Sequence, residues 1–494
     1  MPDYMFLLQS RLSSEQHAAL VLVQRAAQNH AVNVYLTGGA VRDLISGAPI
    51  HDLDFTVEGN PAAMLRELEK SGARLAGEDA TLREAEILFP ADTDASVCAA
   101  REEIYKLPGA SPESRWATIT EDLRRRDFSI NAVAISLNPA SRGLLLDPTN
   151  GLADIERREV RALSIHCFTN QPVRLLRILR FAARLGYQIE SRTKDWFERA
   201  IERGLDKQIP AADLGRELRQ LGNEAHPAAV VKSWESHGLL TAFHRSFGKH
   251  RPDYEGLGRL GRAFEQMSAA GLKVRMLAPM TGYFLQGLNP RERLLLLRKL
   301  GLRPQEVASV AKLDAAVRDA VKTLKGRQTE SPLDAYRFLD ALPRDVMAFV
   351  LAEHADVRVT NKVRNYLQKW RPLRLALPAA ELEALGVPRG PGFDRILEQL
   401  FERQLKGKGK TAIDRTRLLR QLAGIKPEPK KAPEKKPAKG KAKSGTGKTA
   451  SPAKATKPGK GERQEPAPER AAAKSAEREN AARGQRRHAA AASH

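Results

Sequence analysis

The chain has 494 residues, of which 42% are hydrophobic and 29% charged, and its formal net charge is +23. This length predicts about two to four domains, and the apolar content excludes a chain that is disordered as a whole. The large positive charge favours a polyanionic partner, either nucleic acid or an acidic membrane surface.

Cysteine content and hydropathy indicate the compartment. The two cysteines, Cys98 and Cys167, have no His or Cys neighbours at zinc-ligand spacing, so neither a disulfide framework nor a structural zinc site is predicted. No run of about 18 apolar residues occurs, and the first residues lack a basic start followed by a long apolar core. The sequence therefore predicts a soluble protein of the reducing cytoplasm without a membrane span.

The first predicted elements alternate between helix and strand. A Ser-capped segment at residues 13–30 carries apolar residues at helical spacing. It is followed by the β-rich run VNVYLTGG at 32–39, one or two turns of helix at 40–46, and the alternating strand HDLDFTVEG at 51–59. The resulting order is strand, Gly-Gly, helix, strand.

Two larger regions follow from the rest of the pattern. Further strands are predicted at 85–90, 95–100 and 129–138, so residues 1–150 should form a mixed α and β domain on a small sheet. From Gln171 to Leu422 apolar residues recur at spacings of three and four, which predicts an almost wholly helical region.

The C-terminal segment 426–494 differs in composition from the rest of the chain. It contains 19 Lys and Arg against 7 Asp and Glu, and almost no large apolar residue. Such a segment cannot offset the entropy cost of ordering, so it is predicted to be a disordered basic extension. It could act as a solubilising appendage or hold RNA weakly through counterion release.

The stretch YLTGGAVRDLISGAPIHDLDFTVEG places two chemical features close together. Residues two apart on a strand face the same side, so Asp52 and Asp54 project together while Leu53 points into the core. Two such carboxylates can hold magnesium beside a triphosphate. Gly38 and Gly39 let backbone amides approach phosphate oxygens, and the following helix points its positive end towards the same place.

Together these motifs resemble the class II tRNA nucleotidyltransferase and bacterial poly(A) polymerase family, a branch of the polymerase-β-like nucleotidyltransferases. The matching stretches, in the family's order, are GGAVRDLISGAPIHDLDF, DLRRRDFSINAVA, DPTNGLADI, PVRLLRILRFAARLGY and the helical tail segment ALGVPRGPGFDRILEQLFERQLKGKGKT. The resemblance implies an α+β protein with a nucleotidyltransferase head and small mixed sheet at 1–150. All-α regions follow: a neck that reads the base and binds RNA at 151–225, and a body and tail that bind tRNA at 226–425, before the disordered basic segment at 426–494.

The resemblance also implies roles for single residues. Asp52 and Asp54 would be catalytic and would hold the magnesium ions that bridge the triphosphate and activate the RNA 3′ hydroxyl, and Asp43 would be a partner of Arg42. Arginine and polar side chains suit phosphate and ribose. The implied reaction is in-line attack on the α-phosphorus with release of pyrophosphate. The implied nucleotide-binding set is Gly38, Gly39, Arg42, Arg125, Arg126, Asp127, Asn131, Asn170, Gln171, Arg174 and Arg177.

Two positions depart from the family pattern. The family's neck helix begins with two acids followed by x-x-Arg, whereas this chain reads NQPVR, so Asn170 and Gln171 replace the acids and Arg174 remains. An amide can accept from a base amino group but can also donate, and the lost charge can cost about tenfold in base discrimination. The family's third metal-side carboxylate aligns with Ser96, while Asp94 lies two residues earlier on the same face of the strand.

The sequence therefore predicts a template-independent, magnesium-dependent nucleotidyltransferase that extends RNA 3′ ends, with tRNA as acceptor and CTP and ATP as donors. Poly(A) addition shares all of these motifs, but the resemblance of residues 384–411 to the tail of tRNA-acting relatives favours tRNA. An RNA-binding protein with weakened catalysis is the alternative from another class. The retained Asp52 and Asp54 argue against it, because a pure binder has no need for two like charges beside a basic pocket. Whether all of CCA is added, and the oligomeric state, stay open.

Overall fold

The computed structural model describes residues 3–50, 52–79, 83–90, 93–107, 109–353 and 356–425. The chain divides into two units, Met1–Pro427 and Glu428–His494, and the basic extension predicted at 426–494 lies outside the described residues. Among the described residues, no helix is both long enough and apolar enough to cross a membrane.

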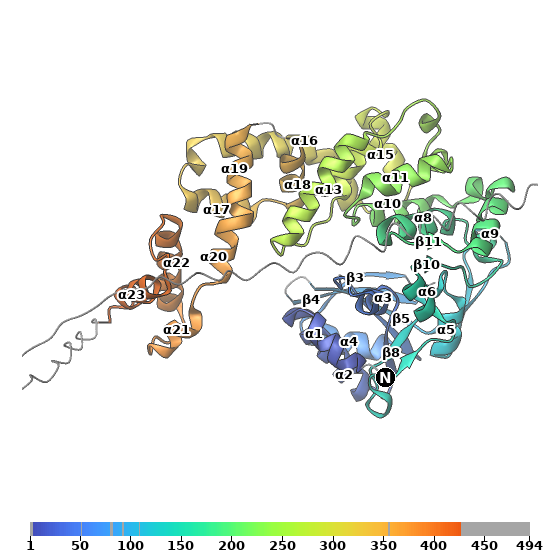
Figure 1. The fold of residues 1–494 in the computed structure, drawn as a ribbon, viewed down its shortest axis with the longest axis horizontal. Helices are drawn as coiled ribbons and strands as arrows, with labels where there is room; N and C mark the ends of the chain where they lie inside the picture. Colours follow the sequence, from blue (N-terminus) through green and yellow to red (C-terminus); the bar gives the residue numbers. More distant parts are fainter. Residues whose placement is uncertain are drawn as a thin grey trace, which may run out of the picture. The chain divides into compact units, whose positions relative to one another are not determined.

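The N-terminal region, the head, combines a sheet with short helices (Figure 1). Its elements in chain order are α1 (Tyr4–Arg11), α2 (Ser14–Asn29), β1 (Asn33–Thr37), α3 (Gly38–Ser46), β2 (Leu53–Glu58), α4 (Ala62–Lys70), β3 (Arg74–Asp79), β4 (Glu84–Phe89), β5 (Thr93–Ala99), β6 (Arg101–Ile104), β7 (Glu113–Trp116), α5 (Ile119–Arg125), β8 (Ala134–Ser136), β9 (Leu145–Leu146) and α6 (Gly151–Arg157).

The main sheet is mixed; one face packs on the main core of the head, and the other carries polar side chains of β2 and a small apolar cluster with α5. Within the described residues it contains seven strands in the order β3-β4-β5-β2-β1-β8-β9, with β2 parallel to β5 and the other neighbours antiparallel. Leu53, Phe55 and Val57 of β2 are fully buried in a core that also contains Leu20 of α2 and Met64 of α4. These helices therefore cover the apolar face, and the side chains between the buried ones lie on the other face.

The predicted order of helix, strand, Gly-Gly, helix and strand is confirmed. Helix α2 begins after Ser13, whose Oγ accepts from the Gln16 amide, while the Gln16 side chain accepts from the Ser13 amide. One detail differs from the expected turn: Gly38 and Gly39 are the first two residues of α3 itself.

The strand predicted at 129–138 is wrong in its first half. Ser129–Asn131 form a 3₁₀ turn, and only Ala134–Ser136 pair in the sheet. The cause is a tertiary contact: the Ser129 hydroxyl donates to the buried Asp154 carboxylate at 2.5 Å, and a Cβ on Gly151 would lie 2.2 Å from the Ser129 carbonyl oxygen. A side chain bonded in this way competes with a strand ladder, and α6 leaves no room for a straight strand.

The region after the head is helical, as predicted. Its elements are β10 (Glu159–Val160), α7 (Cys167–Asn170), α8 (Arg174–Leu185), β11 (Gln188–Ile189), α9 (Ser191–Glu202), α10 (Ala211–Leu221), α11 (Pro227–Ser236), α12 (Leu240–Phe243), α13 (Tyr254–Ala269), α14 (Leu277–Phe284), α15 (Pro290–Lys299), α16 (Pro304–Lys325), α17 (Pro332–Ala341), α18 (Arg344–Glu353), α19 (Val357–Asn365), α20 (Arg371–Leu375), α21 (Ala379–Ala384), α22 (Pro391–Leu405) and α23 (Ala412–Leu422). The fold class is thus α+β, and the boundaries proposed at 150, 225 and 425 stay predictions.

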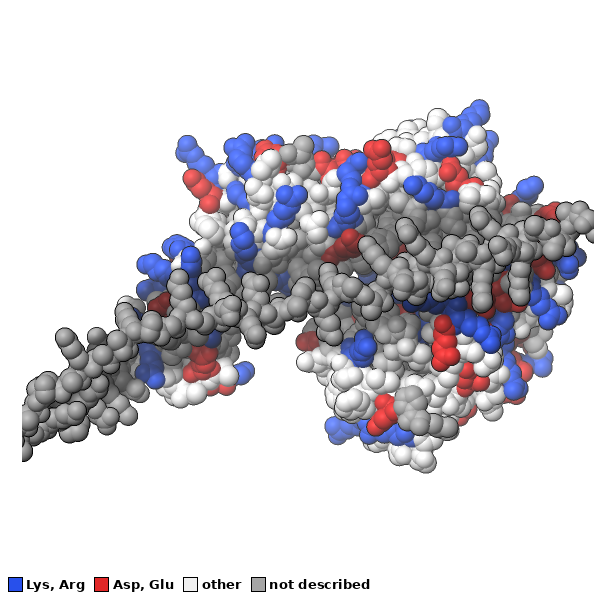
Figure 2. Space-filling view, viewed as in Figure 1, with Lys and Arg blue, Asp and Glu red and all other residues white. Residues whose placement is uncertain are grey.

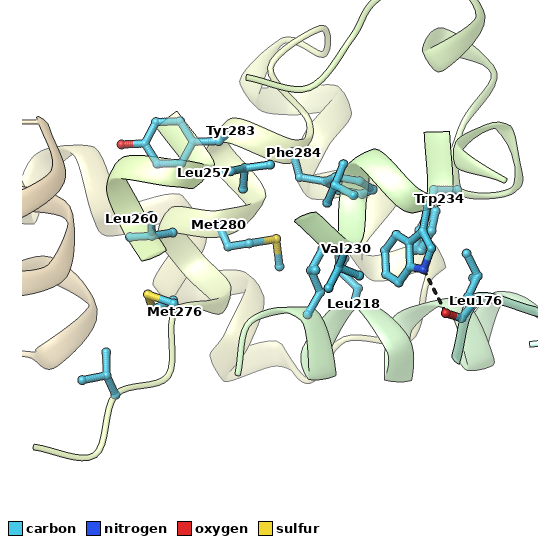
Figure 3. Close-up of a cluster of buried hydrophobic side chains, with 14 of the residues drawn as sticks. Leu176, Leu218, Val230, Trp234, Leu257, Leu260, Met276, Met280, Tyr283 and Phe284 are labelled. Atoms are coloured by element: carbon cyan, nitrogen blue, oxygen red, sulfur yellow. Dashed lines mark hydrogen bonds between the residues drawn. The ribbon is translucent and has the colours of Figure 1, made fainter. Parts of the chain in front are cut away.

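Helix α8 is fixed to the helices behind it by apolar packing and one directed hydrogen bond. Leu176 of α8 and Trp234 of α11 are fully buried, and the Trp234 indole donates to the Leu176 carbonyl at 2.9 Å (Figure 3). Leu218 of α10, Met280 of α14 and Phe284 belong to the same core. This anchoring holds the remaining face of α8, which carries arginines, in a defined position.

Candidate active site

The two predicted catalytic carboxylates lie close to one another: Asp54 is in β2, and Asp52 directly precedes the first residue of that strand. Strand β2 is paired in parallel with β5 so that Asp54 stands opposite Ser96, and the Ser96 hydroxyl donates to Asp54 Oδ1 at 2.8 Å. Asp94 and Ser96 are two residues apart and lie on the same face of β5, while Ala95 between them is buried in the core. Asp52, Asp54, Asp94 and Ser96 together are called the carboxylate face below.

The start of α3 lies directly against the carboxylate face. A Cβ built on Gly38 would lie 3.3 Å from Asp54 Oδ2 and 3.3 Å from Arg126 Nη1, and Gly38 has a φ of +65°. A side chain here would be strained by the backbone and pressed against both groups, so the position requires glycine. On Gly39 a Cβ would lie 3.5 Å from Arg42 Nη2. The predicted grouping of glycines, arginine and carboxylate is therefore present in space.

Arg126 lies beside Gly38 and Asp54 at the carboxylate face. Its guanidinium donates to Asp122 Oδ2 at 2.9 Å, to Thr56 Oγ1 at 3.1 Å and to the Asn131 carbonyl at 3.1 Å. Asp122 is fully buried in the first turn of α5 and fixes the arginine in place. One positive charge is therefore held beside Asp54 and Gly38, where an anionic ligand would meet it.

The electrostatics of Asp54 favour binding of a cation. Burial raises the pKa of the Asp54 carboxyl, the Ser96 hydrogen bond opposes that shift, and the like charge of Asp52 adds to it. Within the described residues no group of three or more His, Cys, Asp or Glu side chains is placed to hold a metal ion. The carboxylate pair nevertheless fits a divalent cation of the magnesium type, which takes one or two carboxylates and completes its shell with phosphate oxygens and water.

Asp94 does not stand free as a third carboxylate. It contacts the Lys273 ammonium, and Arg275 Nη2 lies 2.6 Å from its Oδ2. Burial acts to raise the pKa of Asp94, but the two cations outweigh it and the pKa is lowered. The Lys273 ammonium also lies 3.6 Å from Asp52 Oδ1. A loop between α13 and α14 thus places a cation between two carboxylates of the carboxylate face.

Helix α8 joins the head through a closed circuit of charged and polar side chains, called the head–neck ring below. Arg42 pairs with Asp43 at 2.8 Å and donates to Asn131 Oδ1 at 2.7 Å. The Asn131 amide donates to Asp127 at 3.3 Å, and Arg177 of α8 pairs with Asp127 at 2.9 Å. The ring continues through Glu217, Arg180, Glu224 and Arg184, and Arg184 returns to Asp43 at 3.5 Å.

The head–neck ring is charge-balanced and buried at its centre, whereas Arg184 at its edge is exposed. The Glu217 side chain is 1% exposed and bridges Arg177 and Arg180, each at 2.9 Å. Burial raises the pKa of Asp127, but Arg177 and Arg174 reverse the shift and hold it at about 2. Arg42, Asp127, Asn131 and Arg177 of the predicted set therefore serve first to join head and neck, and their contacts with a nucleotide stay predictions.

The predicted base-reading residues run from the end of α7 to the first residue of α8, which is Arg174. Gln171 donates through Nε2 to the Tyr105 hydroxyl at 2.5 Å. Arg174 is buried, bonds weakly to the Cys167 carbonyl at 3.5 Å, and its Nε has no hydrogen-bond partner among the described residues. Asn170 lies at the end of α7, with its carbonyl accepting from the Gly109 amide at 3.2 Å.

Arg125 stands apart from the carboxylate face. Its guanidinium donates to Asp122 Oδ1 at 2.6 Å, to Glu103 Oε1 at 3.0 Å and to the Arg101 carbonyl at 2.7 Å. All of these partners are protein groups on the β6 side of α5. The structure therefore gives Arg125 a place supporting Glu103, and direct nucleotide binding by Arg125 stays a prediction.

Sequence reasoning missed the partners of the predicted residues. Glu217 and Glu224 are separated in sequence by 37 to 44 residues from Arg177 and Arg180, which they hold. The spacing of three and four along Arg174, Arg177, Arg180 and Arg184 was a usable signal. A stripe of this kind usually lies in solvent, and only the acidic residues of α10 and of the segment after it show that it is buried.

Comparisons with known proteins agree with this geometry. Residues 34–161 match the Poly A polymerase head domain. The match runs from β1 to β10 and includes the carboxylate face, α3 and α5. The N-terminal region is therefore a nucleotidyltransferase head of the poly(A) polymerase type, a class of domain that generally uses a divalent metal ion.

Relatives extend the similarity beyond the head. An A-adding tRNA nucleotidyltransferase of Geobacter sulfurreducens is 28% identical over 409 residues, which cover 79% of this chain and 45% of that protein. A CC-adding tRNA nucleotidyltransferase of Deinococcus radiodurans is 38% identical over 150 residues, 30% of this chain and 40% of that protein. A solved CCA-adding enzyme in apo form II is 23% identical, with a TM-score of 0.48, and the alignment covers 86% of this chain and 99% of that one.

The chain spans about half the length, or less, of the two relatives described above. The matching head and the relatives support the family predicted from the motifs. What the comparisons show for this chain is a head domain of the poly(A) polymerase type at residues 34–161 and similarity to tRNA nucleotidyltransferases that extends beyond it.

Proposed function

We propose that this chain is a template-independent nucleotidyltransferase that transfers nucleotides from CTP and ATP to the 3′ end of tRNA in the cytoplasm, with Mg²⁺ as cofactor and pyrophosphate as product. The observation that carries the proposal is the carboxylate face: Asp54 on β2 with Asp52 just before that strand, beside Gly38 at the start of α3 and Arg126 at the end of α5. The names of the A-adding and CC-adding relatives support tRNA as the acceptor.

The residues of the site suit in-line transfer on the α-phosphorus. Asp52 and Asp54 would hold the magnesium, which neutralises phosphate charge and makes the 3′ hydroxyl more acidic. Arg126 and the amides at Gly38 and Gly39 would bind the triphosphate, since a fixed guanidinium and a helix N-terminus both favour phosphate oxygens. Gln171 and Arg174 would contact the base, and positioning rather than covalent chemistry would supply the rate.

The surface charge supports an RNA partner. Figure 2 shows Lys and Arg side chains, in blue, spread over both the head and the helical region on the face drawn, with acidic side chains among them. A distributed basic surface binds the phosphate backbone of a large nucleic acid without reading its sequence.

Two other functions each have an observation in their favour. The Poly A polymerase head match is equally compatible with poly(A) addition, because the motifs of the head are shared by both activities. Ser96 in place of a third carboxylate favours a member of the family that binds RNA but turns over slowly.

The test uses the purified full chain, Mg²⁺ and a labelled tRNA transcript ending before CCA. Each nucleoside triphosphate is supplied singly and then CTP with ATP, and the double variant Asp52→Ala, Asp54→Ala serves as control. Addition of C, of A, or of CCA that disappears in the control supports the proposal. Long A tracts indicate poly(A) polymerase, and tight tRNA binding without incorporation indicates the RNA-binding protein.

A further inference from the structure

Gln171 stands where relatives carry an acid, and an amide has both an accepting and a donating end. Which end faces a ligand decides what it can recognise. In this chain the Gln171 side chain is tied to Tyr105, whose hydroxyl lies 2.5 Å from Gln171 Nε2 and 2.5 Å from Glu103 Oε2. Glu103, Tyr105 and Gln171 thus form a short chain of hydrogen bonds, called the relay below, that ends just before α8.

Glu103 is the fixed end of this relay. Its side chain is 3% exposed and pairs with Arg101 at 2.9 Å and with Arg125 at 3.0 Å. Burial acts to raise the pKa of Glu103, but the two arginines outweigh it and the pKa is lowered. Glu103 is therefore an ionised carboxylate at neutral pH and can only accept hydrogen bonds.

The direction of both hydrogen bonds follows from that charge. A tyrosine hydroxyl has one proton, and beside an ionised carboxylate it donates that proton to the carboxylate. The Tyr105 oxygen then has only lone pairs left for Gln171, so the amide must turn its NH₂ towards Tyr105. Its carbonyl oxygen, Oε1, is consequently the end available to a ligand, which is the acceptor that the missing acid would have supplied.

A donor stands beside this acceptor. Arg174 is the first residue of α8, three positions after Gln171, and its positive charge acts on Tyr105. The Arg174 side chain is almost fully buried and its Nε lacks a hydrogen-bond partner among the described residues. A buried unpaired donor costs free energy until a ligand or a rearrangement supplies an acceptor. An acceptor and a donor side by side match the amino group and unprotonated ring nitrogen shared by cytosine and adenine.

We propose that Tyr105 is a positioning residue for base selection, which holds Gln171 in the accepting orientation towards the amino group of the incoming cytosine or adenine. This inference rests on the proposed function. The Gln171 amide released from Tyr105 could rotate and offer its NH₂ to the carbonyl oxygen of uracil or guanine. Tyr105 thus compensates for the missing carboxylate.

The experiment is a double-mutant cycle on nucleotide choice. Full-length wild type, Tyr105→Phe, Gln171→Asp and the double variant are assayed on tRNA transcripts ending before CCA or after CC. The measured quantity is kcat/KM for CTP against UTP, or for ATP against GTP. Tyr105→Phe should lower this ratio about fivefold, the value of one net hydrogen bond of about 1 kcal/mol. In the Gln171→Asp background the same change should have no effect, because a carboxylate has no donating end.

Tyr283→Phe is the matched control. The Tyr283 hydroxyl donates to Glu353 Oε1 at 2.7 Å, so the change removes the same kind of Tyr–Glu bond from the helical core, away from α8. Its nucleotide ratio should equal that of the wild type. An unchanged ratio in Tyr105→Phe, an equal loss in both backgrounds, or a wild type that accepts CTP and UTP alike would overturn the inference while leaving nucleotide transfer intact.

A binding measurement distinguishes failure of the proposed function from failure of the inference about Tyr105. Equilibrium dialysis with labelled CTP, UTP, ATP and GTP gives the same ratios without turnover. If the wild type incorporates no nucleotide, the proposed function fails, and the binding ratios still decide the role of Tyr105. A preference that falls in Tyr105→Phe but not in the Gln171→Asp background supports it, and equal ratios overturn it.

Discussion

The carboxylate face and the head–neck ring are both rich in charged side chains, but their acidic side chains are paired in different ways. In the head–neck ring every buried acid faces an arginine, and Glu217 bridges two of them at 2.9 Å. On the carboxylate face Asp54 accepts a hydrogen bond from the Ser96 hydroxyl, and the ammonium of the half-exposed Lys273 lies 3.6 Å from Asp52 Oδ1. The pKa of Asp127 is lowered while that of Asp54 is raised by burial.

The two clusters of charged side chains are therefore expected to have different roles, one in stability and the other in ligand binding. In the ring each charge has a partner of opposite sign, so keeping these charges buried adds little unfavourable free energy. The ring can therefore hold the head and the neck together. A pair of like charges that is only partly compensated costs free energy when no ligand is bound, and a ligand that supplies positive charge lowers that cost. The ring should therefore govern stability, and the carboxylate face should govern ligand binding and turnover.

The largest effect is expected at Asp54. In Asp54→Asn, nucleotide incorporation into tRNA should fall about 10³-fold, the equivalent of several kcal/mol of lost charge stabilisation. The melting temperature measured without divalent metal should not fall, because burial makes the Asp54 charge unfavourable in the empty site. A much lower melting temperature in the variant would show that Asp54 contributes to stability, as the residues of the ring do, and would contradict this prediction.

The second prediction concerns the ring itself. Glu217→Ala leaves Arg177 and Arg180 without their shared partner, and breaking a buried pair in this way costs about 3–5 kcal/mol. Urea denaturation measures the free energy of unfolding, and the exposed Glu202→Ala on α9 serves as control. A loss below about 1 kcal/mol would mean that the ring contributes little to the joint between head and neck.

Asp127 gives the ring a defined pH dependence. Its pKa is held at about 2 against a usual 3.8, a difference worth about 2 kcal/mol. Because the folded pKa is the lower one, this stabilisation is present at neutral pH and is lost as the pH falls from about 4 towards about 2. Asp127→Asn should therefore be less stable than the wild type at pH 7, and the gap should close near pH 2. An equal gap at both pH values would contradict this role, and the exposed Asp195→Asn is the control.

A smaller effect is expected at Ser96. Its hydroxyl orients Asp54 at 2.8 Å and lowers the pKa of that carboxyl against the effect of burial. Removing a group that orients a metal ligand costs about tenfold or more in metal affinity. Titrating Mg²⁺ against incorporation by Ser96→Ala, beside Ser10→Ala from the exposed end of α1, measures this. An unchanged Mg²⁺ requirement would show that Asp54 needs no orienting partner.

The smallest effect is expected at Lys273. Its ammonium lies between Asp52 and Asp94 and competes with any cation bound there. Exposed ion pairs are worth about 0–1 kcal/mol, so Lys273→Ala should change the free energy of unfolding by no more than that and should strengthen Mg²⁺ binding by less than about fivefold. Weaker Mg²⁺ binding would instead make Lys273 part of the site that binds the nucleotide.

Local sequence patterns were sufficient for the head and its principal residues. The apolar alternation of HDLDFTVEG fixed which face Asp52 and Asp54 share, and the Ser-capped helical pattern at 13–30 fixed α2, because both depend on short-range periodicity. The strand expected at 129–138 failed where a contact with Asp154 and Gly151, more than 20 residues away, overrode local preference.

The sequence by itself determined the type of head domain, the carboxylate pair and the helical character of the region after the head, since motif spacing and hydrophobic period are readable along the chain. Only the tertiary structure decided how the predicted residues are used. It turned Arg125 towards Glu103, buried the arginines of α8 against Glu217 and Glu224, and placed Tyr105 on Gln171 across 66 residues. Hydrogen bonds and ion pairs between distant segments have no periodic signal, because they depend on where the fold brings each side chain.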